Sequence, residues 1–209
     1  MAPRLTPESL SGTENQSATP PEFRRALRRK LIGMRQALSA SECERLSTLL
    51  CNHLRNDFPQ LAGMRVAFCW PVQNEPDLRP LIEEWIAAEK PGFCALLPVV
   101  LDSRAALAFR TWSPASRLVE DRHGIPTPLE GDFLAPDALL LPVNGFDPAG
   151  YRIGYGGGYF DRTLAAMKPR PLAIGVGFEL ARVDSIHPED HDQRLDAIVT
   201  EAGSYRPAP

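Results

Sequence analysis

Two amphipathic helices are predicted near the start of the chain. Apolar side chains recur every three or four residues at Phe23, Leu27, Leu31, Met34 and Leu38. This spacing is typical of one helix face, and it predicts a helix over residues 21–38. Ser39 and Glu42 then form a Ser-x-x-Glu capping box, which predicts the start of a second helix. That helix carries an apolar stripe and is expected to end near Phe58.

Short apolar runs and helical patterns alternate along the rest of the chain. Strands are predicted at residues 65–70, 93–100, 107–112, 138–143 and 172–177, with the last at 197–200. Helices are predicted at residues 78–86 and 159–167, and residues 113–136 are interpreted as loop because they are rich in proline and glycine. This alternation is typical of an α/β fold. We expect a three-layer αβα arrangement with a mostly parallel central sheet, preceded by the two N-terminal helices.

Composition narrows the class of protein. The 209 residues suffice for one α/β domain, expected over residues 21–209, while residues 1–20 have the composition of a disordered tail. A net charge of −3 disfavours a broad nucleic-acid-binding face. No apolar run approaches the ~20 residues of a membrane span, and the N-terminus does not resemble a secretory signal. The four cysteines include no CxxC pair, so free thiols in the cytoplasm are expected.

A glycine-rich segment carries the strongest chemical signal. Residues 140–162 read as a strand, a turn, a glycine-rich loop and the start of a helix. In a parallel sheet, such a loop opens into the ligand crevice at the carboxyl ends of the strands. Glycines let the backbone approach a ligand, and the N–H groups of the loop and helix start attract anions. Arg152 and Arg162 suit phosphate oxygens, and Asp161 suits magnesium.

The glycine-rich segment differs from two common nucleotide-binding patterns. No Gly-Lys-Ser/Thr follows the glycines, so it is not a Walker A loop, and its spacing is not that of a dinucleotide-binding turn. A tight, mobile connection between strand and helix is the plain structural alternative. We favour phosphate binding because arginine, several glycines, aromatic residues and Asp161-Arg162 occur in one short run.

Residues 150–162 resemble the hallmark of the 5-formyltetrahydrofolate cyclo-ligase family. That hallmark reads Gly-x-Arg-x-Gly-x-Gly-x-Gly-Tyr-Tyr-Asp-Arg, and here Phe160 replaces the second tyrosine. The four other matching segments, in order, are Arg24 to Arg28, Phe68 to Pro80, His123 to Pro128, and a C-terminal signature made of residues 188–192 with residues 195–201. The resemblance covers about residues 21–203. Five linked motifs are far more specific than a glycine-rich loop alone.

The resemblance implies an ATP-dependent ligase that converts 5-formyltetrahydrofolate to 5,10-methenyltetrahydrofolate, with ATP as co-substrate and Mg²⁺ as cofactor. The implied ATP contacts are Arg24, Arg28, Arg152, Gly154, Tyr155, Gly156, Gly157 and Gly158. The implied folate contacts are Trp70, Glu75, His123, Tyr159 and Phe160, and the implied magnesium ligands are Asp161 and Asp192. Arg152 and Tyr159 are the implied catalytic residues. The expected partners are small molecules only, without nucleic acid or membrane, and the expected state is a monomer, with a weak homodimer as the alternative.

Several of these residues have a simpler interpretation. Trp70 stands at a strand end, where core packing is common, and Glu75 lies in a turn. We interpret Arg25 and Arg29 as a solvated face of the first helix. The acidic and histidine residues at 187–192 are interpreted as a solvated loop in preference to a zinc site.

The sequence also departs from the family pattern. Arg24 stands where lysine is usual, His123 where an aromatic ring is common, and Ala181 where glutamine is frequent. These departures leave open a paralogue that acts on another N-formyl compound. Two other classes are also open: a sugar-phosphate isomerase or CoA-transferase-like enzyme on a similar scaffold, and a non-catalytic module that binds folate or nucleotide.

Overall fold

A computed structural model of the protein describes residues 19–207. The predicted disordered tail lies outside the described residues, apart from Thr19 and Pro20 at the start of the first helix. Helix α1 spans Pro20–Gln36 and α2 spans Ala40–Asp57. Ser39 forms the predicted capping box with Glu42, since each backbone N–H donates to the other side chain at 3.2 Å.

The centre of the fold is a seven-stranded sheet with strand order β11-β10-β9-β6-β1-β2-β3. Its strands are β1 (Arg65–Ala67), β2 (Cys94–Val99), β3 (Ala108–Thr111), β6 (Ala138–Pro142), β9 (Leu172–Val176), β10 (Ala197–Thr200) and β11 (Gly203–Tyr205). The five inner strands pair in parallel, and only the edge strands β3 and β11 run antiparallel to their neighbours. The prediction of an α/β fold with a mostly parallel sheet is confirmed.

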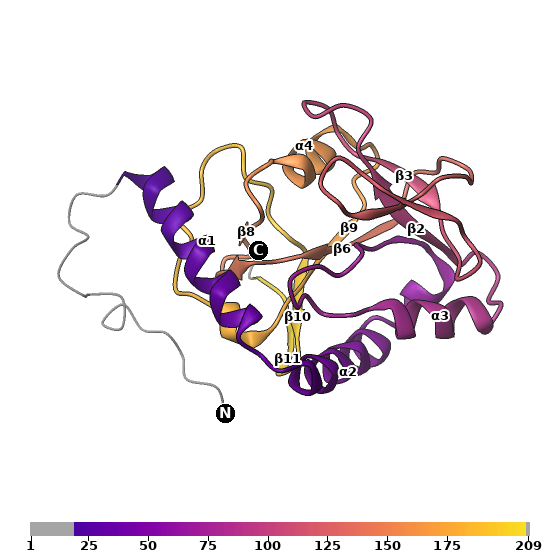
Figure 1. The fold of residues 1–209 in the computed structure, drawn as a ribbon, viewed down its shortest axis with the longest axis horizontal. Coiled ribbons are helices and arrows are strands. Elements are labelled where there is room, and N and C mark those ends of the chain that lie inside the picture. Colours follow the sequence, from indigo (N-terminus) through magenta and orange to yellow (C-terminus); the bar gives the residue numbers. More distant parts are fainter. Residues whose placement is uncertain (1–18, 208–209) are drawn as a thin grey trace.

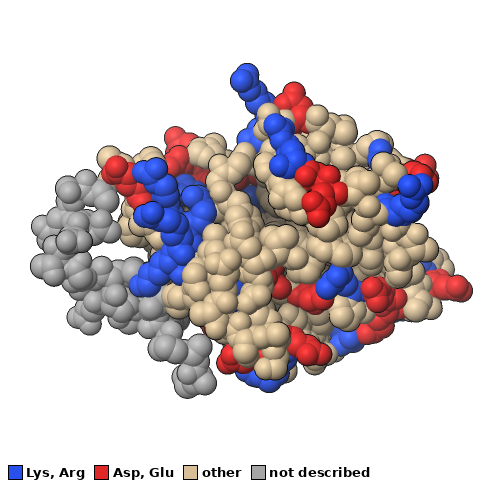
Figure 2. Space-filling model, in the orientation of Figure 1, with Lys and Arg blue, Asp and Glu red and all other residues tan. Residues whose placement is uncertain are grey.

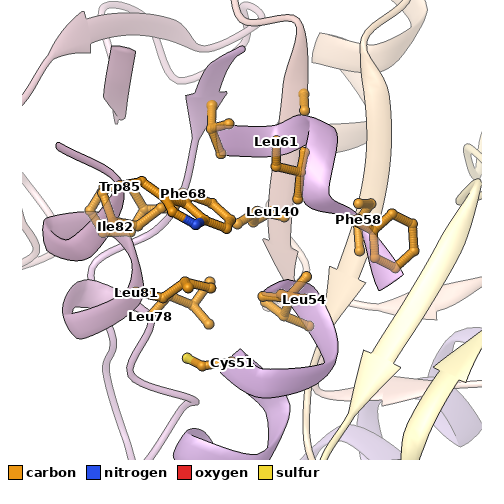
Figure 3. Packing of buried hydrophobic residues seen from close by; sticks show 14 of the residues in the cluster. Cys51, Leu54, Phe58, Leu61, Phe68, Leu78, Leu81, Ile82, Trp85 and Leu140 are labelled. Carbon is orange, nitrogen blue, oxygen red and sulfur yellow. The ribbon is translucent and has the colours of Figure 1, made fainter. Parts of the chain in front are cut away.

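Successive side chains of the inner strands point to opposite faces, and each face has its own hydrophobic cluster. Leu140 packs with residues of α2 and of α3 (Arg79–Ala87), whereas Leu139 and Leu141 pack with Leu164 of α4 (Tyr159–Ala166). In Figure 1, α2 and α3 lie below the sheet and α4 lies above it. Figure 3 shows the cluster on the α2–α3 side, where Leu54, Leu81 and Phe68 meet.

Helix α1 stands apart from these two clusters. Its Leu27 and Leu31 pack against Ile153, Val183 and Ile186 in a third, smaller cluster. The short 3₁₀ helices Pro59–Gly63 and Glu179–Ala181 complete the helical elements of the described chain. Of the two N-terminal helices expected to precede the αβα layers, α2 therefore packs on the sheet, while α1 is placed beside the glycine-rich segment.

The sequence-based prediction missed a β-hairpin and the last strand of the described chain. Residues 113–136, predicted as loop, contain an antiparallel hairpin of β4 (Leu118–Glu120) and β5 (Pro126–Pro128). Both ends of β5 are proline residues, which lack an N–H donor. Proline is tolerated here because the sheet has only two strands, so both are edge strands. The strand at 197–200 is not the last, because a turn after Thr200 returns the chain as β11. No helix in residues 19–207 is long and apolar enough to cross a membrane.

Candidate active site around the glycine-rich loop

The glycine-rich segment begins at the carboxyl end of β6, which pairs with β1 and β9 in the middle of the sheet. It first forms a small hairpin of β7 (Gly145–Phe146) and β8 (Arg152–Ile153), then a loop over residues 154–158, then α4. Gly156 and Gly158 have φ angles of 96° and 64°, which a residue with a side chain adopts only at a cost. The path of the loop into α4 thus favours glycine at both positions.

Helix α1 presents its arginines to this loop. Arg28 Nε donates to the Gly154 carbonyl at 2.6 Å, and a methyl group at Gly156 would lie 3.4 Å from the Arg28 guanidinium carbon. Lys and Arg side chains gather over the part of the surface formed by α1 (Figure 2). Arg25 and Arg29 are exposed, as predicted for a solvated face. The implied ATP residue Arg28 is therefore beside the glycines that the same resemblance assigned to ATP.

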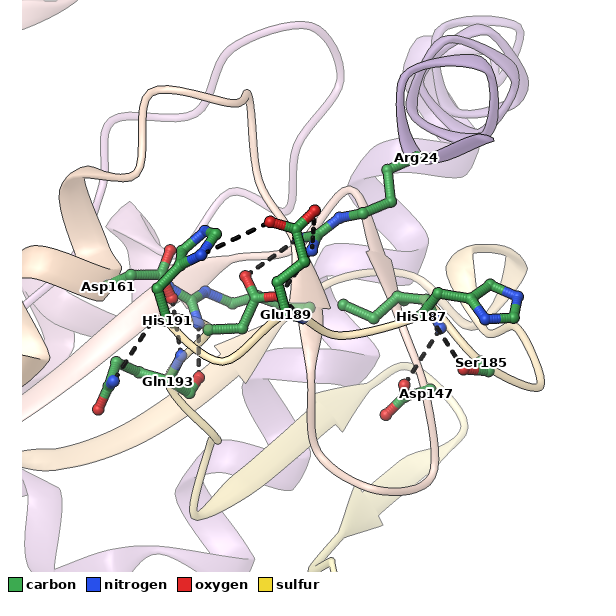
Figure 4. Close-up of polar contacts among 11 residues, drawn as sticks. Arg24, Asp147, Asp161, Ser185, His187, Glu189, His191 and Gln193 are labelled. Carbon is green, nitrogen blue, oxygen red and sulfur yellow. Dashed lines mark hydrogen bonds and ion pairs between the residues drawn. The ribbon is translucent and has the colours of Figure 1, made fainter. Parts of the chain in front are cut away.

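Two arginine–aspartate pairs lie next to the loop. Arg24 donates to both carboxylate oxygens of Asp192, at 2.6 and 3.0 Å (Figure 4). Arg152, which is 6% exposed, donates to Asp161 Oδ1 at 3.1 Å and to the Gln193 carbonyl at 2.8 Å. Burial lowers the pKa of Arg152 and the charge of Asp161 opposes this, yet a guanidinium stays protonated at any ordinary pH. Both arginines thus carry positive charge at the site.

The two aspartates differ as candidate metal ligands. Asp161 Oδ1 accepts from Arg152 and from the Gln193 N–H, while Oδ2 has no hydrogen-bond partner among residues 19–207. Both oxygens of Asp192 accept from Arg24, and Oδ2 also accepts from the Glu189 N–H at 2.7 Å. Asp161 therefore fits a magnesium ion as it stands, whereas Asp192 fits one only if Arg24 releases it. No group of three or more His, Cys, Asp or Glu in the described chain forms a metal site by itself.

Glu75 lies on the other side of the loop and is buried, not a plain turn residue. Its Oε1 accepts from the Tyr155 hydroxyl at 2.7 Å and its Oε2 from the Val72 N–H at 3.1 Å. Burial raises the pKa of Glu75, against the opposing effects of the Tyr155 hydrogen bond and the charge of Arg35. Tyr155 thus joins the loop assigned to ATP with the carboxylate assigned to folate.

Sequence reasoning missed Arg35 and Asn144. Arg35 is 4% exposed and donates to Asn144 Oδ1 at 2.6 Å, to the Tyr155 hydroxyl at 2.9 Å and to the Gln73 carbonyl at 2.9 Å. Asn144 Nδ2 is buried without a partner in the described part of the chain. The signal for Arg35 was its position four residues after Leu31, which puts a charge on the apolar face of α1.

The remaining implied folate residues divide into two groups. His123, in the turn of the β4–β5 hairpin, places Nε2 at 3.4 Å from the Tyr159 hydroxyl. Trp70 contacts Trp112 and the Arg79 guanidinium, and it packs against the α2–α3 cluster. Phe160 packs against the cluster on the α4 face. The structure thus brings His123 to Tyr159, while Trp70 and Phe160 make the contacts of packing residues.

The histidines of the C-terminal segment do not converge. The His187 ring packs edge-on against Phe23, and His191 Nδ1 lies 3.6 Å from an oxygen of Glu189 (Figure 4). The segment that carries them contacts α1 instead, through the Arg24–Asp192 pair. Its contribution to the site is therefore Asp192 and the backbone of Gln193.

Comparison with known proteins identifies the family. Residues 21–201 match the profile of the 5-formyltetrahydrofolate cyclo-ligase family. The chain is 30% identical to the 5-formyltetrahydrofolate cyclo-ligase of Escherichia coli K12 (79% of this chain, 93% of the relative). It is 24% identical to the mouse protein of that name (85% and 93%).

Solved structures give the same result. The 5,10-methenyltetrahydrofolate synthetase of Aquifex aeolicus superposes with a TM-score of 0.76 at 30% identity, over 90% of this chain and 94% of that one. The synthetase from Mycoplasma pneumoniae, at 22% identity, has the same fold with a TM-score of 0.69, over 85% and 98% of the two chains. The chain therefore belongs to the 5-formyltetrahydrofolate cyclo-ligase family.

Proposed function

We propose that this protein catalyses the ATP-dependent cyclisation of 5-formyltetrahydrofolate to 5,10-methenyltetrahydrofolate. The observation that carries the proposal is the position of the glycine-rich loop. Arg28 contacts the loop at Gly154, and Tyr155 of the same loop donates to the buried carboxylate of Glu75. A phosphate-binding loop and a buried acceptor for N–H groups are thus adjacent, as a reaction between ATP and a folate requires.

The chemistry needs charge neutralisation more than a protein nucleophile. The formyl oxygen attacks the γ-phosphorus of ATP and ADP leaves, which turns a poor leaving group into a phosphate ester. N10 then attacks the formyl carbon and loses its proton, and phosphate leaves with the carbon–oxygen bond electrons. Transition states of phosphoryl transfer are stabilised by positioned cations and N–H donors. The arginines and glycines of this site are groups of that kind.

The roles follow from the contacts. Arg152 and Arg28 would bind phosphate oxygens, with Arg24 joining them once it leaves Asp192. The N–H groups of residues 154–158 and of the first turn of α4 would bind the same phosphates. Tyr159 would contact the formyl group, with His123 beside its hydroxyl. Glu75 would accept the paired N–H groups of the pterin. Asp161 and Asp192 would hold Mg²⁺, which would neutralise phosphate charge.

We propose that the protein forms a single cytoplasmic domain over residues 21–209. It would act on small molecules as a monomer. It consumes an N-formyl folate and ATP and takes neither nucleic acid nor membrane as a partner. The departures at His123 and Phe160 concern the folate side of the site. The experiment must therefore distinguish 5-formyltetrahydrofolate from a different N-formyl substrate.

The test is the absorbance of the methenyl-folate product when purified protein is mixed with 5-formyltetrahydrofolate and Mg-ATP. We expect an ATP-dependent rise that is lost in Arg152→Ala and in Tyr159→Ala, and that persists in Arg29→Ala, an exposed control on α1. Absence of the rise in the wild-type protein, with ATP binding retained, would overturn the substrate assignment. Retention of full activity in Arg152→Ala would overturn the assigned site.

A further inference from the structure

Arg35 joins four separate segments of the chain beneath the glycine-rich loop. It comes from the last turn of α1 and contacts Gln73 in the loop after β1, Asn144 after β6, and Tyr155 in the glycine-rich loop. Its Nη2 also lies 3.9 Å from Glu75 Oε1. The turn that carries Glu75 is fastened to the same helix end, since the Asn74 amide donates to the Leu38 carbonyl at 3.1 Å.

Burial makes this arrangement unusual. The side chains of Arg35 and Glu75 are 4% and 3% exposed. A buried ion pair is seldom more stable than well-packed apolar side chains of the same volume, because both charges must lose their hydration. The arginine therefore calls for an explanation other than stability.

We propose that Arg35 is a positioning residue that keeps the Glu75 carboxylate ionised and aligned to accept the N–H groups of the folate pterin, and that holds Tyr155 against it. This inference rests on the proposed function for the identity of the substrate. Arg35 does not itself touch substrate or ATP in this scheme. It acts through Glu75 and Tyr155, which face the folate and phosphate sides of the site.

The charged and titratable groups around Glu75 determine in which direction the pKa of Glu75 would shift if Arg35 were removed. Three such groups face it: Arg35 from α1, Tyr155 from the glycine-rich loop, and Cys69 from the residues after β1. Burial raises the pKa of Glu75, while the hydrogen bond from Tyr155 and the charge of Arg35 lower it. Burial also raises the pKa values of Tyr155 and Cys69, which are therefore neutral at physiological pH. Arg35 is thus the only cation among the groups that face Glu75 in the described chain.

Removing this cation should raise the pKa of Glu75 and weaken folate binding at low pH. Without Arg35, the pKa of Glu75 rises further, so a larger fraction of the carboxyl is protonated near neutral pH. A protonated carboxyl cannot accept two N–H donors, and the affinity for folate falls. Raising the pH restores the carboxylate. The variant should therefore gain a pH dependence in which activity increases toward alkaline pH.

The experiment compares Arg35→Gln with Arg35→Lys and with Arg29→Gln, an exposed arginine of the same helix. The measurement is kcat/KM for 5-formyltetrahydrofolate at saturating ATP, from about pH 6 to about pH 9. We expect kcat/KM of Arg35→Gln to fall at least about tenfold at the acid end of this range, which corresponds to a shift of one pKa unit. The value should recover toward alkaline pH. Arg35→Lys keeps the charge and should retain the wild-type profile, and Arg29→Gln should match wild type throughout.

A second measurement separates this inference from the substrate assignment. Carboxyl NMR titration, with the Glu75 resonance identified by its absence in Glu75→Gln, reports the Glu75 pKa without any substrate. We expect that pKa to be higher in Arg35→Gln than in wild type. An unchanged Glu75 pKa would overturn the inference whether or not the protein turns over folate. Failure of wild type to form methenyl folate, with the pKa shifted as expected, would overturn the proposed function alone.

A double variant distinguishes positioning from a purely structural role. If Arg35 acts through the charge of Glu75, then Arg35→Gln should change kcat/KM much less in a Glu75→Gln background than in wild type. A loss that is equal in both backgrounds and independent of pH would mean that Arg35 serves only to hold the fold. If Arg35→Gln does not fold, Arg35→Lys gives the NMR comparison, and a Glu75 pKa far from that of wild type in this variant would contradict the inference.

Discussion

Arg24 and Asp192 are 168 residues apart in the sequence and are joined by two hydrogen bonds of 2.6 and 3.0 Å between guanidinium and carboxylate. The pair fastens the start of α1 to the C-terminal segment that precedes β10 (Figure 4). While the pair is intact, both carboxylate oxygens of Asp192 and both Nη atoms of Arg24 are engaged with each other. Binding of Mg-ATP would therefore exchange the partners, with Arg24 turning to phosphate and Asp192 to magnesium.

Arg24→Met should weaken ATP binding. A hydrogen bond to a charged group contributes about 1.5–3 kcal/mol, so KM for ATP should rise by about ten- to a hundredfold. The KM for folate should change little, because Arg24 lies on the phosphate side of the loop. The matched control is Arg25→Met, the neighbouring exposed residue on α1, which should leave both KM values unchanged. An unchanged KM for ATP in Arg24→Met would remove this residue from the site.

Asp192→Asn should alter the dependence of stability on pH. Burial opposes ionisation of Asp192, but the hydrogen bonds from Arg24 prevail and hold its pKa below the usual range. A carboxyl with a depressed folded-state pKa adds stability above its unfolded pKa and loses it as pH falls through the folded value. Wild type should thus be more stable than Asp192→Asn at neutral pH, and the difference should shrink on acidification. Denaturation curves over a pH series measure this, and parallel curves would contradict it.

Two glycines of the loop should respond differently to alanine. A methyl group at Gly154 would meet nothing within 4 Å, whereas Gly156 has a φ of 96° and faces the Arg28 guanidinium. Gly156→Ala should therefore cost about 1–2 kcal/mol of stability from the backbone alone. Gly154→Ala should leave the melting temperature unchanged and still raise KM for ATP if phosphates approach this backbone. A Gly154→Ala protein with wild-type KM would show that the ATP phosphates do not approach the backbone of this residue.

Tyr159→Phe isolates the hydroxyl on the folate side. If the hydroxyl donates to the reacting formyl group as proposed, its loss should reduce kcat by about tenfold, with ATP affinity unchanged. The companion variant His123→Phe restores the ring type common in the family. Since His123 is exposed and its contact with Tyr159 is 3.4 Å long, this change should alter kcat by no more than about threefold. Equal losses in the two variants would indicate that the pair acts as one unit.

Much of the fold was accessible from local patterns. The Ser39 capping box, the apolar stripe of α2 and the strand at 197–200 follow directly from spacing, because helix and strand periods are properties of the backbone. The β4–β5 hairpin and β11 were missed for a common reason. They are short edge elements with proline or glycine at their ends, and their pairing is decided by the strand beside them, not by their own propensity.

The candidate site was accessible in part. Arg152, Asp161 and the glycines stand in one run, so their proximity follows from chain connectivity. Arg28 and Glu75 were named only through a resemblance, and the structure places both at residues of the same loop. Arg35 was passed over although its place on the apolar face of α1 was visible. A buried charge can be recognised from the pattern, but its partners cannot.

The sequence by itself determined the periodic elements, the α/β class and a glycine-rich loop after a central strand, because each depends on residues close together in the chain. Only the tertiary structure decided which charges meet: Arg24 with Asp192, Arg35 with Tyr155, and Tyr155 with Glu75. These contacts join segments that are 80 to 168 residues apart in the chain. The geometry of the two Arg contacts depends on how α1 packs beside the sheet. This packing is driven by hydrophobic contact, which has no direction, so the position of α1 cannot be predicted from a local sequence pattern.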